Sequence, residues 1–389
     1  MNYICFSPYF PPNYFRFSVS LKKYGVNVLG IGDAAYDDLH PELKSTLTEY
    51  YRVDDLHHYD GLVGAVAYFT ERYGHIDGID SHNEYWLETE ARLRGEFNID
   101  GLKPEDMGRI RKKSEMKKVF QTTGLNVARG ILSDSFENAL DFVNKTGYPL
   151  IAKPDSGVGA ANTWKIENES ELADFFRDKP DIDYMLEEFI QGDIYSFDGM
   201  VDKSGKLVFY TAMKNEKGVM EVVHEDSHVY YYTLRDIPAD LEVAGKKMLA
   251  AFDVRGRFFH FEFFREYTTL RLVALEVNMR PPGGFTTDMF NFASDVDVYN
   301  AWAGMIANQP VTVDFSRKYH VCFVSRKWKY DYLYTHEALM EKYPKELVFH
   351  ERVNDALSRA MGNTCYLVRS PGLDQLFEVQ QAIHQLKSL

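Results

Sequence analysis

Three oxygen-bearing side chains occur within one short stretch, FFHFEFFREYTTLRLVALEVNMRPPGG (258–284). Glu262 lies between phenylalanines, whereas Glu276 and Asn278 are two positions apart, so on a strand their side chains leave the same face. Arg280 follows directly. Two carboxylates and an amide suit a hard divalent cation such as Mg²⁺, which takes one or two carboxylates together with substrate phosphates and water.

The residues around this group predict two strands joined by a turn at 267–269. β-Branched and aromatic residues fill both runs, and Pro-Pro-Gly-Gly ends the second. An ordinary antiparallel hairpin with one solvated face would also carry a glutamate on each strand. The hairpin alone therefore leaves both interpretations open, and the rest of the chain has to distinguish them.

Length and composition favour a globular protein of two or three domains, with 389 residues of which 45% are hydrophobic. The net charge of −14 makes a nucleic-acid backbone an unfavourable partner. Cys5, Cys322 and Cys365 have no metal-type spacing and are expected to be reduced thiols. No signal-type leader and no run of about 18 apolar residues appears, so we expect a cytoplasmic protein without a membrane span.

The first third of the chain alternates between strand and helix patterns. Strands are predicted at 2–6, 26–31 and 76–80, and helices at 14–24 and 61–73. This order predicts a doubly wound, mostly parallel sheet with ligands at the carboxyl ends of its strands.

Two features at that edge have competing interpretations. The sequence Gly30-Ile-Gly32-Asp-Ala-Ala35 matches a dinucleotide-binding pattern, but it follows the second strand and precedes a predicted loop, which argues against a nicotinamide site. His82, Asn83 and Glu84 follow the 76–80 strand. They either contact a substrate or take part in a helix cap formed by Ser81 or Asn83.

A lysine on a buried strand marks the middle of the chain. Residues 103–111 are predicted to be a basic connection between domains, followed by a helix at 113–123 with Ser114 as N-cap and Gly124 after its end. Lys153 lies on the apolar strand 149–154, where its charge needs an anionic partner. The small-residue loop 155–161 that follows can present backbone N–H groups to phosphate oxygens.

Two adjacent glutamates follow on the strand YMLEEFI (184–190). Glu187 and Glu188 must point to opposite faces, so one can face a buried site while the other is solvated. The next strands are predicted at 194–201 and 206–214. Gly199 to Lys206 resembles a P-loop, but its glycine spacing is wrong and it joins two strands, so it is predicted to be a hairpin turn.

Taken together, these motifs resemble the ATP-grasp superfamily over roughly residues 1–310, nearest to its carbamoyl-phosphate-synthase-like and amino-acid-ligase branch. The order matches: a lysine before a helix, a strand lysine before a Gly-rich loop, a strand ending in Glu-Glu-Phe-Ile, and a glutamate strand followed by Glu-x-Asn-x-Arg. The resemblance implies an α/β fold with an α+β ATP clamp. The domains would be 1–103 (doubly wound), 104–190 (small ATP-grasp subdomain), 191–310 (large subdomain with the metal site) and 311–389 (C-terminal extension).

The resemblance also implies a role for each residue. Lys113 and Lys153 would hold the ATP phosphates under a loop that includes Ser156, Gly157 and Gly159. Glu187 would accept a hydrogen bond from the adenine amino group, beside the backbone of Glu188, Phe189 and Ile190. Glu262, Glu276 and Asn278 would hold one or two Mg²⁺ ions, or Mn²⁺, and Lys153 and Arg280 would be catalytic.

One position departs from the family pattern. Where a ribose-binding glutamate is common, this chain has Ile194, so Asp193 is the candidate for the ribose. Lys214 and His260 are further candidates to face the site, although a strand histidine among aromatic residues also has a purely structural interpretation.

The implied reaction joins a carboxylate, which in this branch can be an amino acid, to an amine, with ATP activating the carboxylate as an acyl phosphate. The protein would act on small molecules as a monomer or homodimer. A kinase or carboxylase on the same fold, or a non-catalytic nucleotide-binding regulator, are the alternatives. The segment 311–389 is expected to be a small α/β appendage, unless Arg326, His336 or His350 helps to select the substrate.

Overall fold

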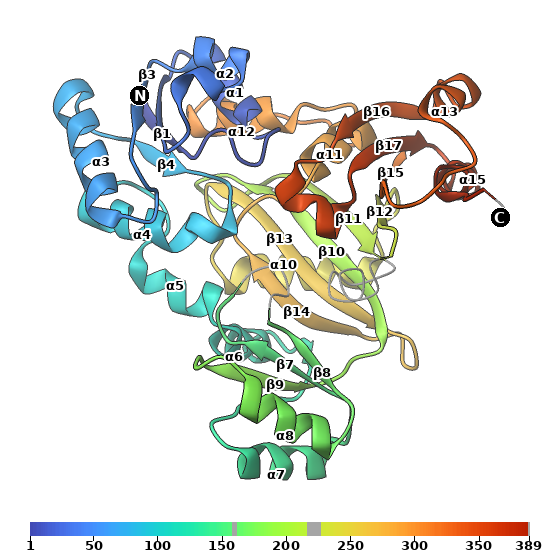
Figure 1. The fold of residues 1–389 in the computed structure, drawn as a ribbon. Helices are drawn as coiled ribbons and strands as arrows, with labels where there is room; N and C mark the ends of the chain where they lie inside the picture. The colour runs from blue at the N-terminus through green and yellow to red at the C-terminus, as the bar shows by residue number, and fades with distance from the viewer. Residues whose placement is uncertain (158–161, 216–226, 388–389) are drawn as a thin grey trace.

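The computed structural model describes residues 1–157, 162–215 and 227–387, which form three β-sheets with helices packed around them (Figure 1). The N-terminal sheet lies at the upper left of the figure, a large sheet crosses the middle, and a small sheet lies below it. Gly159 falls outside the described residues. None of the helices in these ranges is both long enough and apolar enough to cross a membrane.

The N-terminal sheet is parallel throughout, in the order β3-β2-β1-β4. On β1, Tyr3 and Cys5 pack with the hydrophobic cluster around helix α1, whereas Ile4 and Phe6 pack with helices α3 and α4 on the other face. Helices on both faces confirm the doubly wound prediction. The bounds are β1 Asn2–Phe6, α1 Phe15–Lys23, β2 Asn27–Gly32, η1 Tyr36–Asp38, α2 Pro41–Thr46, β3 Glu49–Arg52, α3 Tyr59–Tyr73, β4 Gly78–Asp80, η2 Glu84–Trp86 and α4 Leu87–Glu96.

Gly30 and Gly32 have a packing role on β2. A Cβ atom at Gly30 would lie 2.8 Å from the Tyr50 ring, and one at Gly32 would lie 2.5 Å from the Tyr9 ring. Close packing of aromatic rings therefore accounts for both glycines, without a dinucleotide.

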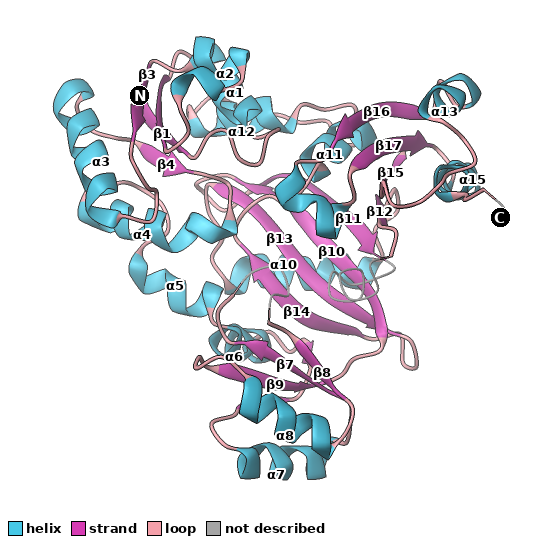
Figure 2. Ribbon diagram, viewed as in Figure 1, coloured by secondary structure: helices cyan, strands magenta, loops and turns pink. Residues whose placement is uncertain are grey.

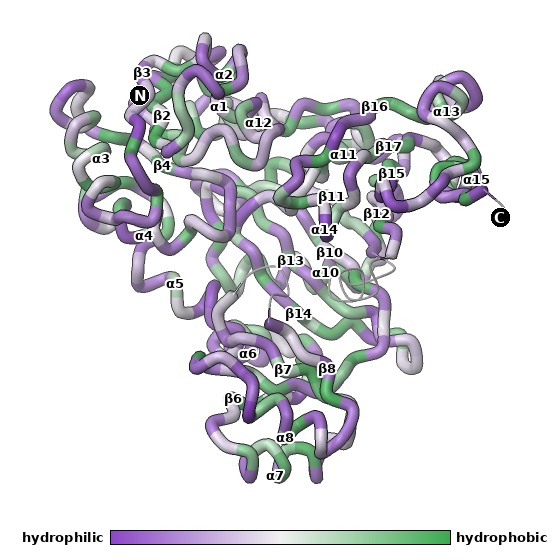
Figure 3. The backbone as a smooth tube through the Cα atoms, viewed as in Figure 1, coloured by the Kyte–Doolittle hydropathy of each residue, from purple (hydrophilic) through white to green (hydrophobic). Residues whose placement is uncertain are grey.

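The small sheet is antiparallel, in the order β6-β9-β7-β8, and helices α7 and α8 pack on it (Figure 2). Its elements are β6 Gly130–Leu132, α7 Phe136–Thr146, β7 Leu150–Pro154, β8 Trp164–Ile166, α8 Glu169–Asp178 and β9 Tyr184–Glu188. The two helices alternate between hydrophobic and hydrophilic residues, as expected when one face is buried (Figure 3).

The large sheet has nine strands, in the order β16-β17-β15-β12-β11-β10-β13-β14-β5. Helices α6 and α10 cover one face through a cluster that includes Phe120, Met248 and Phe261. On the other face, Phe258 packs with the N-terminal sheet and helix α12. The bounds are α5 Pro104–Arg111, α6 Lys113–Thr122, β5 Asn126–Val127, β10 Gly192–Val201, β11 Leu207–Asn215, β12 Tyr230–Thr233, α10 Ala239–Ala251, β13 Arg257–Glu266, β14 Leu272–Asn278, α11 Thr286–Ser294 and α12 Val298–Ile306.

The C-terminal segment continues the large sheet. Strand β15 pairs with β12, so the edge of the central strands is extended by β15, β17 and β16. The segment was expected to be an appendage beside the core, but pairing of backbone groups makes it part of the same sheet. Its elements are β15 His320–Arg326, α13 His336–Lys342, β16 Leu347–Arg352, η3 Asp355–Leu357, α14 Ser358–Met361, β17 Thr364–Ser370 and α15 Leu373–His384.

One local prediction is wrong and another gains detail. The basic connection predicted at 103–111 is formed by the helix α5, which begins with a proline at its first turn. Ser114 does not cap α6: the N-cap is Lys112, and the Ser114 hydroxyl donates to Asp155 at 2.9 Å instead. A hydroxyl inside the first turn is free to bond to a distant carboxylate, which local sequence does not reveal.

Candidate active site

A square of four polar side chains lies on one face of the β13–β14 hairpin. Glu262 pairs directly with Glu276, and His260 pairs with Asn278. Opposed residues of antiparallel strands have Cβ atoms about 5 Å apart. The predicted metal-binding residues are therefore adjacent, and His260, a further candidate from the sequence, is the fourth corner.

The two carboxylates of this square have opposite pKa shifts. Burial tends to raise the pKa of Glu262, but the hydrogen bond and charge of His260, with Arg280 and Lys153, lower it overall. Burial also raises the pKa of Glu276, and the nearby Glu262 charge adds to this rise against the opposing charge of Lys113. One carboxylate is thus held ionised while its neighbour lacks full compensation for its charge.

His260 links this square to the interior of the sheet. Its Nδ1 atom lies 2.5 Å from the fully buried carboxylate of Asp198, which also accepts a hydrogen bond from Ser196 at 2.5 Å. Its Nε2 atom lies 3.6 Å from Glu262. Burial opposes the imidazolium, but the Asp198 charge and hydrogen bond raise the pKa of His260 to about 9. His260 therefore has a structural anchor and also faces the candidate site.

Lysines from two elements meet the acidic residues. Lys153 on β7 lies 2.7 Å from Glu187, which is the anionic partner that a buried lysine requires. Lys117 on α6 lies 3.0 Å from the other oxygen of Glu187, and Lys113 lies 3.5 Å from Glu276. Burial raises the pKa of Glu187, but the two lysine charges more than offset it and the pKa is lowered.

Glu187 and Glu188 point in opposite directions, as predicted. Glu187 is buried, whereas Glu188 is half-buried and pairs with Arg129 at 2.6 Å. The Glu188 N–H donates to the carbonyl of Arg129, and the Phe189 N–H donates to that of Pro149. Ile190 lies beyond the end of β9. The backbone of this segment thus remains close to the buried glutamate and the two lysines.

The start of the small-residue loop is fixed to α6. The Asp155 carboxylate accepts a hydrogen bond from the backbone N–H of Ser114 at 2.7 Å. The backbone carbonyl of Asp155 accepts another from the N–H of Lys113 at 2.8 Å. These bonds hold the N-terminus of α6 next to the end of β7. Ser156 and Gly157 follow directly, so the described part of the loop begins beside the N-terminus of α6.

Asp193 already has two partners at the base of β10. Lys214 lies 2.9 Å from one of its oxygens, and the Tyr267 hydroxyl donates to the other at 2.9 Å. A ribose hydroxyl would have to share or displace these groups. Asp193 is therefore placed on the sheet that carries the metal-binding candidates, with its ribose role remaining a prediction.

Arg280 is held between the square and the N-terminal sheet. It donates to Asn278 at 3.4 Å and to the carbonyl of Pro281 at 2.8 Å. Its Nε atom lies 3.5 Å from Glu84, a buried residue that follows β4. Glu84 also accepts from Arg111 at 3.1 Å. The carboxyl edge of the N-terminal sheet thus reaches the candidate site through Glu84.

Comparison with known proteins agrees with this geometry. Residues 146–288 match the ATP-grasp domain family. The whole structure is similar to that of L-amino acid ligase from Bacillus licheniformis, with 14% identity and a TM-score of 0.75, over 100% of this chain and 98% of the other. The chain contains an ATP-grasp domain. Identities this low show the fold alone.

Two further solved structures extend the comparison. N5-carboxyaminoimidazole synthetase from Staphylococcus aureus matches with 14% identity and a TM-score of 0.72, over 98% of this chain and 96% of that one. Biotin carboxylase from Campylobacter jejuni, as a complex with a nucleotide, matches with 15% identity and a TM-score of 0.69, over 99% and 91%. The fold of the N-terminal and C-terminal regions of this chain is therefore shared with these structures as well.

The polar square fits a divalent cation that is completed by phosphate. Within the described ranges, no group of three His, Cys, Asp or Glu side chains could hold a metal ion by itself. Glu262, Glu276 and Asn278 supply two carboxylates and one amide, and burial together with the Glu262 charge raises the pKa of Glu276. Mg²⁺ usually keeps waters and substrate phosphates in its shell, so an open set of this kind suits it.

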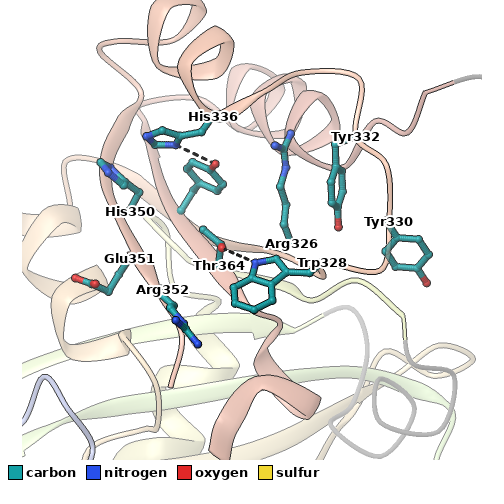
Figure 4. A pocket seen from close by; sticks show the side chains of 10 residues that line it. Arg326, Trp328, Tyr330, Tyr332, His336, His350, Glu351, Arg352 and Thr364 are labelled. Carbon is teal, nitrogen blue, oxygen red and sulfur yellow. Dashed lines mark hydrogen bonds between the residues drawn. The ribbon is translucent and has the colours of Figure 1, made fainter. Parts of the chain in front are cut away.

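Arg326, His336 and His350 come together elsewhere. They line a pocket of about 600 Å³ at the end of β15 (Figure 4). Strand β15 is the fourth strand from β13 in the sheet. At about 4.8 Å per strand, the pocket lies roughly 19 Å along the sheet from Glu262. The structure thus places these three residues together, but apart from the metal-binding candidates.

Two residues of the site were missed by sequence reasoning. Lys117 lies one helical turn after Lys113, and a lysine at a buried helix position was the available signal. Asp198 carries no such signal, because an aspartate on a strand is usually solvated. Glu84 was identified only as a residue of the ligand-facing edge, without its partner Arg280.

Proposed function

We propose that this protein is an ATP- and Mg²⁺-dependent ligase that joins a carboxylate to an amine. The pairing of Glu262 with Glu276 beside Asn278 and Arg280 is the observation that carries this proposal. A protein that only bound a nucleotide would have little need for two carboxylates opposed in this way. An amino acid is the proposed class of carboxylate, in line with the similarity to an L-amino acid ligase.

The proposed roles follow from charge and position. Lys113 and Lys153 bind the phosphates of ATP, together with Ser156 and Gly157. When bound, Mg²⁺ offsets phosphate charge, with Glu262, Glu276 and Asn278 holding it. Glu187 positions Lys153 and Lys117 at 2.7 and 3.0 Å, and adenine binds next to it.

Two displacements complete the proposed reaction. A carboxylate oxygen attacks the γ-phosphorus of ATP, the bond to the bridging oxygen breaks, and ADP leaves. The amine nitrogen then attacks the acyl carbon, phosphate leaves, and the nitrogen loses a proton to form the amide. Arg280 stabilises the charge on the transferring phosphoryl group, and closure of the site protects the acyl phosphate from water.

The test is release of ADP and phosphate with MgATP across a matrix of carboxylates and amines, with mass spectrometry of the products. Release that requires one particular pair, with a product lighter by one water than the two substrates together, supports the ligase. A phosphorylated product without free phosphate would establish a kinase, and a carboxylated product formed with bicarbonate would establish a carboxylase.

The variant Glu276→Gln tests the metal assignment, and Glu266→Gln is its matched control. This change preserves shape but removes a charge opposite Glu262, so we expect turnover to fall by at least about 100-fold. Glu266→Gln, at the exposed end of the same hairpin beside Arg271, should leave turnover nearly unchanged. An unchanged rate in Glu276→Gln would refute the metal assignment.

A further inference from the structure

Aromatic rings surround the pocket that Arg326, His336 and His350 line. This pocket is separate from the proposed ATP site. All its lining residues come from 326–366, and six of them carry rings: Trp328, Tyr330, Tyr332, His336, His350 and Tyr366 (Figure 4). Its volume of about 600 Å³ is within the range of small-molecule sites, roughly 300–1,000 Å³.

Several of these rings are held in place by neighbouring groups. The Trp328 indole N–H donates to Thr364 at 3.4 Å, and the Arg352 guanidinium lies 5.1 Å from its ring centre. A hydrogen bond of 3.1 Å joins His336 to the Tyr366 hydroxyl. Yet 62% of Trp328 is exposed, which leaves a large flat apolar surface open to water. A fixed, exposed indole is suited to stacking on a planar ligand.

Arg326 contributes a positive charge that the described residues do not neutralise. It is only 8% exposed, and its guanidinium donates to the carbonyl oxygens of Ile383 at 2.7 Å and Tyr334 at 2.9 Å. Its Nη2 atom has no hydrogen-bond partner, and among the described residues the guanidinium contacts no carboxylate but the rings of Tyr332, 4.3 Å from the ring centre, and Tyr366, 5.8 Å from it. Burial lowers its pKa. A buried charge without a counter-ion is costly unless a ligand supplies one.

The other charged side chains that line the pocket, those of Glu351 and Arg352, do not pair with Arg326. Arg352 lies at the rim and pairs with Asp355 at 3.1 Å. The Glu351 carboxylate points away from Arg326 (Figure 4). An anion that entered the pocket would therefore face a guanidinium that no carboxylate among the described residues compensates.

We propose that this pocket binds a small aromatic anion, a flat ring that carries one carboxylate or phosphate group. The ring stacks on Trp328, and the anionic group approaches Arg326. The site is distinct from that of the ligase reaction, so it does not depend on the proposed function.

The test is isothermal titration calorimetry with two anionic probes, 4-hydroxyphenylacetate and uridine monophosphate, in the presence of saturating MgADP. The neutral counterparts are 4-hydroxyphenylethanol and uridine. We expect at least one anion to bind with a Kd below about 1 mM, and its neutral counterpart to bind at least about tenfold more weakly. The two anions distinguish a carboxylate site from a phosphate site.

Variants assign the binding to this pocket. Trp328→Ala removes an exposed side chain and should weaken the anion about tenfold without changing the melting temperature. Arg326→Lys should weaken it as well, with circular dichroism confirming the fold. Glu276→Gln should bind the anion as the wild type does. Failure of both anions to bind below about 1 mM, equal binding of the neutral probes, or unchanged binding in Trp328→Ala would each overturn the proposal.

Discussion

Glu84 lies 3.5 Å from Arg280, so that a residue at the carboxyl edge of the N-terminal sheet faces the arginine of the candidate active site. Glu84 is buried, and Arg111 binds its other oxygen at 3.1 Å. A buried carboxylate between two guanidinium groups restricts where each can move. We infer that Glu84 sets the position of Arg280 relative to the substrates.

Glu84→Gln should therefore slow the reaction more than it weakens ATP binding. The amide keeps the shape but loses the charge that attracts Arg280, and we expect kcat to fall about tenfold or more while the KM for ATP changes little. Glu88→Gln, on an exposed position of the next helix, is the matched control and should leave both constants unchanged. A rise in KM alone would show that Glu84 contributes to binding rather than to positioning.

The adjacent glutamates Glu187 and Glu188 should differ strongly in their effect on stability. Glu187→Gln leaves the buried Lys117 and Lys153 without their shared counter-ion, and the free energy of unfolding should fall by about 3 kcal/mol. Glu188→Gln breaks an ion pair with the exposed Arg129 and should cost less than about 1 kcal/mol. Urea denaturation of the two variants measures the difference, and equal losses would contradict the buried pairing.

Stabilisation of the protein by ATP should depend on Mg²⁺ and on the acidic side chains of the β13–β14 hairpin. ATP with Mg²⁺ should raise the melting temperature of the wild type more than ATP with a chelator does, because a ligand that binds the folded state stabilises it. In Glu262→Gln and Glu276→Gln we expect the difference to disappear. Glu266→Gln lies on the same hairpin and should retain it. A persistent difference in both site variants would place the metal elsewhere.

The burial of His82 should make the protein less stable in mild acid. It is packed among rings, with Phe17 at 3.9 Å and Trp302 at 4.6 Å between ring centres, and burial lowers its pKa to about 4 despite the Asp80 charge. The unfolded chain binds a proton near pH 6.5, before the folded protein does. The contribution of neutral His82 to the free energy of unfolding is therefore complete above that pH. It is lost as the pH falls toward 4, and the loss reaches roughly 3 kcal/mol.

The measurement is urea unfolding of wild type and His82→Asn between pH 7 and 4. Asparagine tolerates the positive φ of 58° at this position. The variant starts from lower stability because it lacks the ring contacts, but its stability should change less with pH. His75→Asn, at an exposed position, should follow the wild type. Parallel curves for wild type and His82→Asn would refute the assignment.

The sequence by itself determined what depends on strand and helix periodicity. Alternation along β14 places Glu276 and Asn278 on one face, and the same period separates Glu187 from Glu188. A lysine on the apolar strand β7 requires an anion, and Lys153 has one in Glu187. These inferences hold because each rests on neighbours within a few residues.

Only the tertiary structure decided the partners that the chain brings together from a distance. The packing of α6 on the small sheet brings Lys117 to Glu187, and the pairing of β10 with β13 brings Asp198 to His260. Pairing of β15 with β12 joins the C-terminal segment to the large sheet. Such contacts depend on backbone hydrogen bonds and side-chain packing between elements far apart in sequence, which no local pattern of residues encodes.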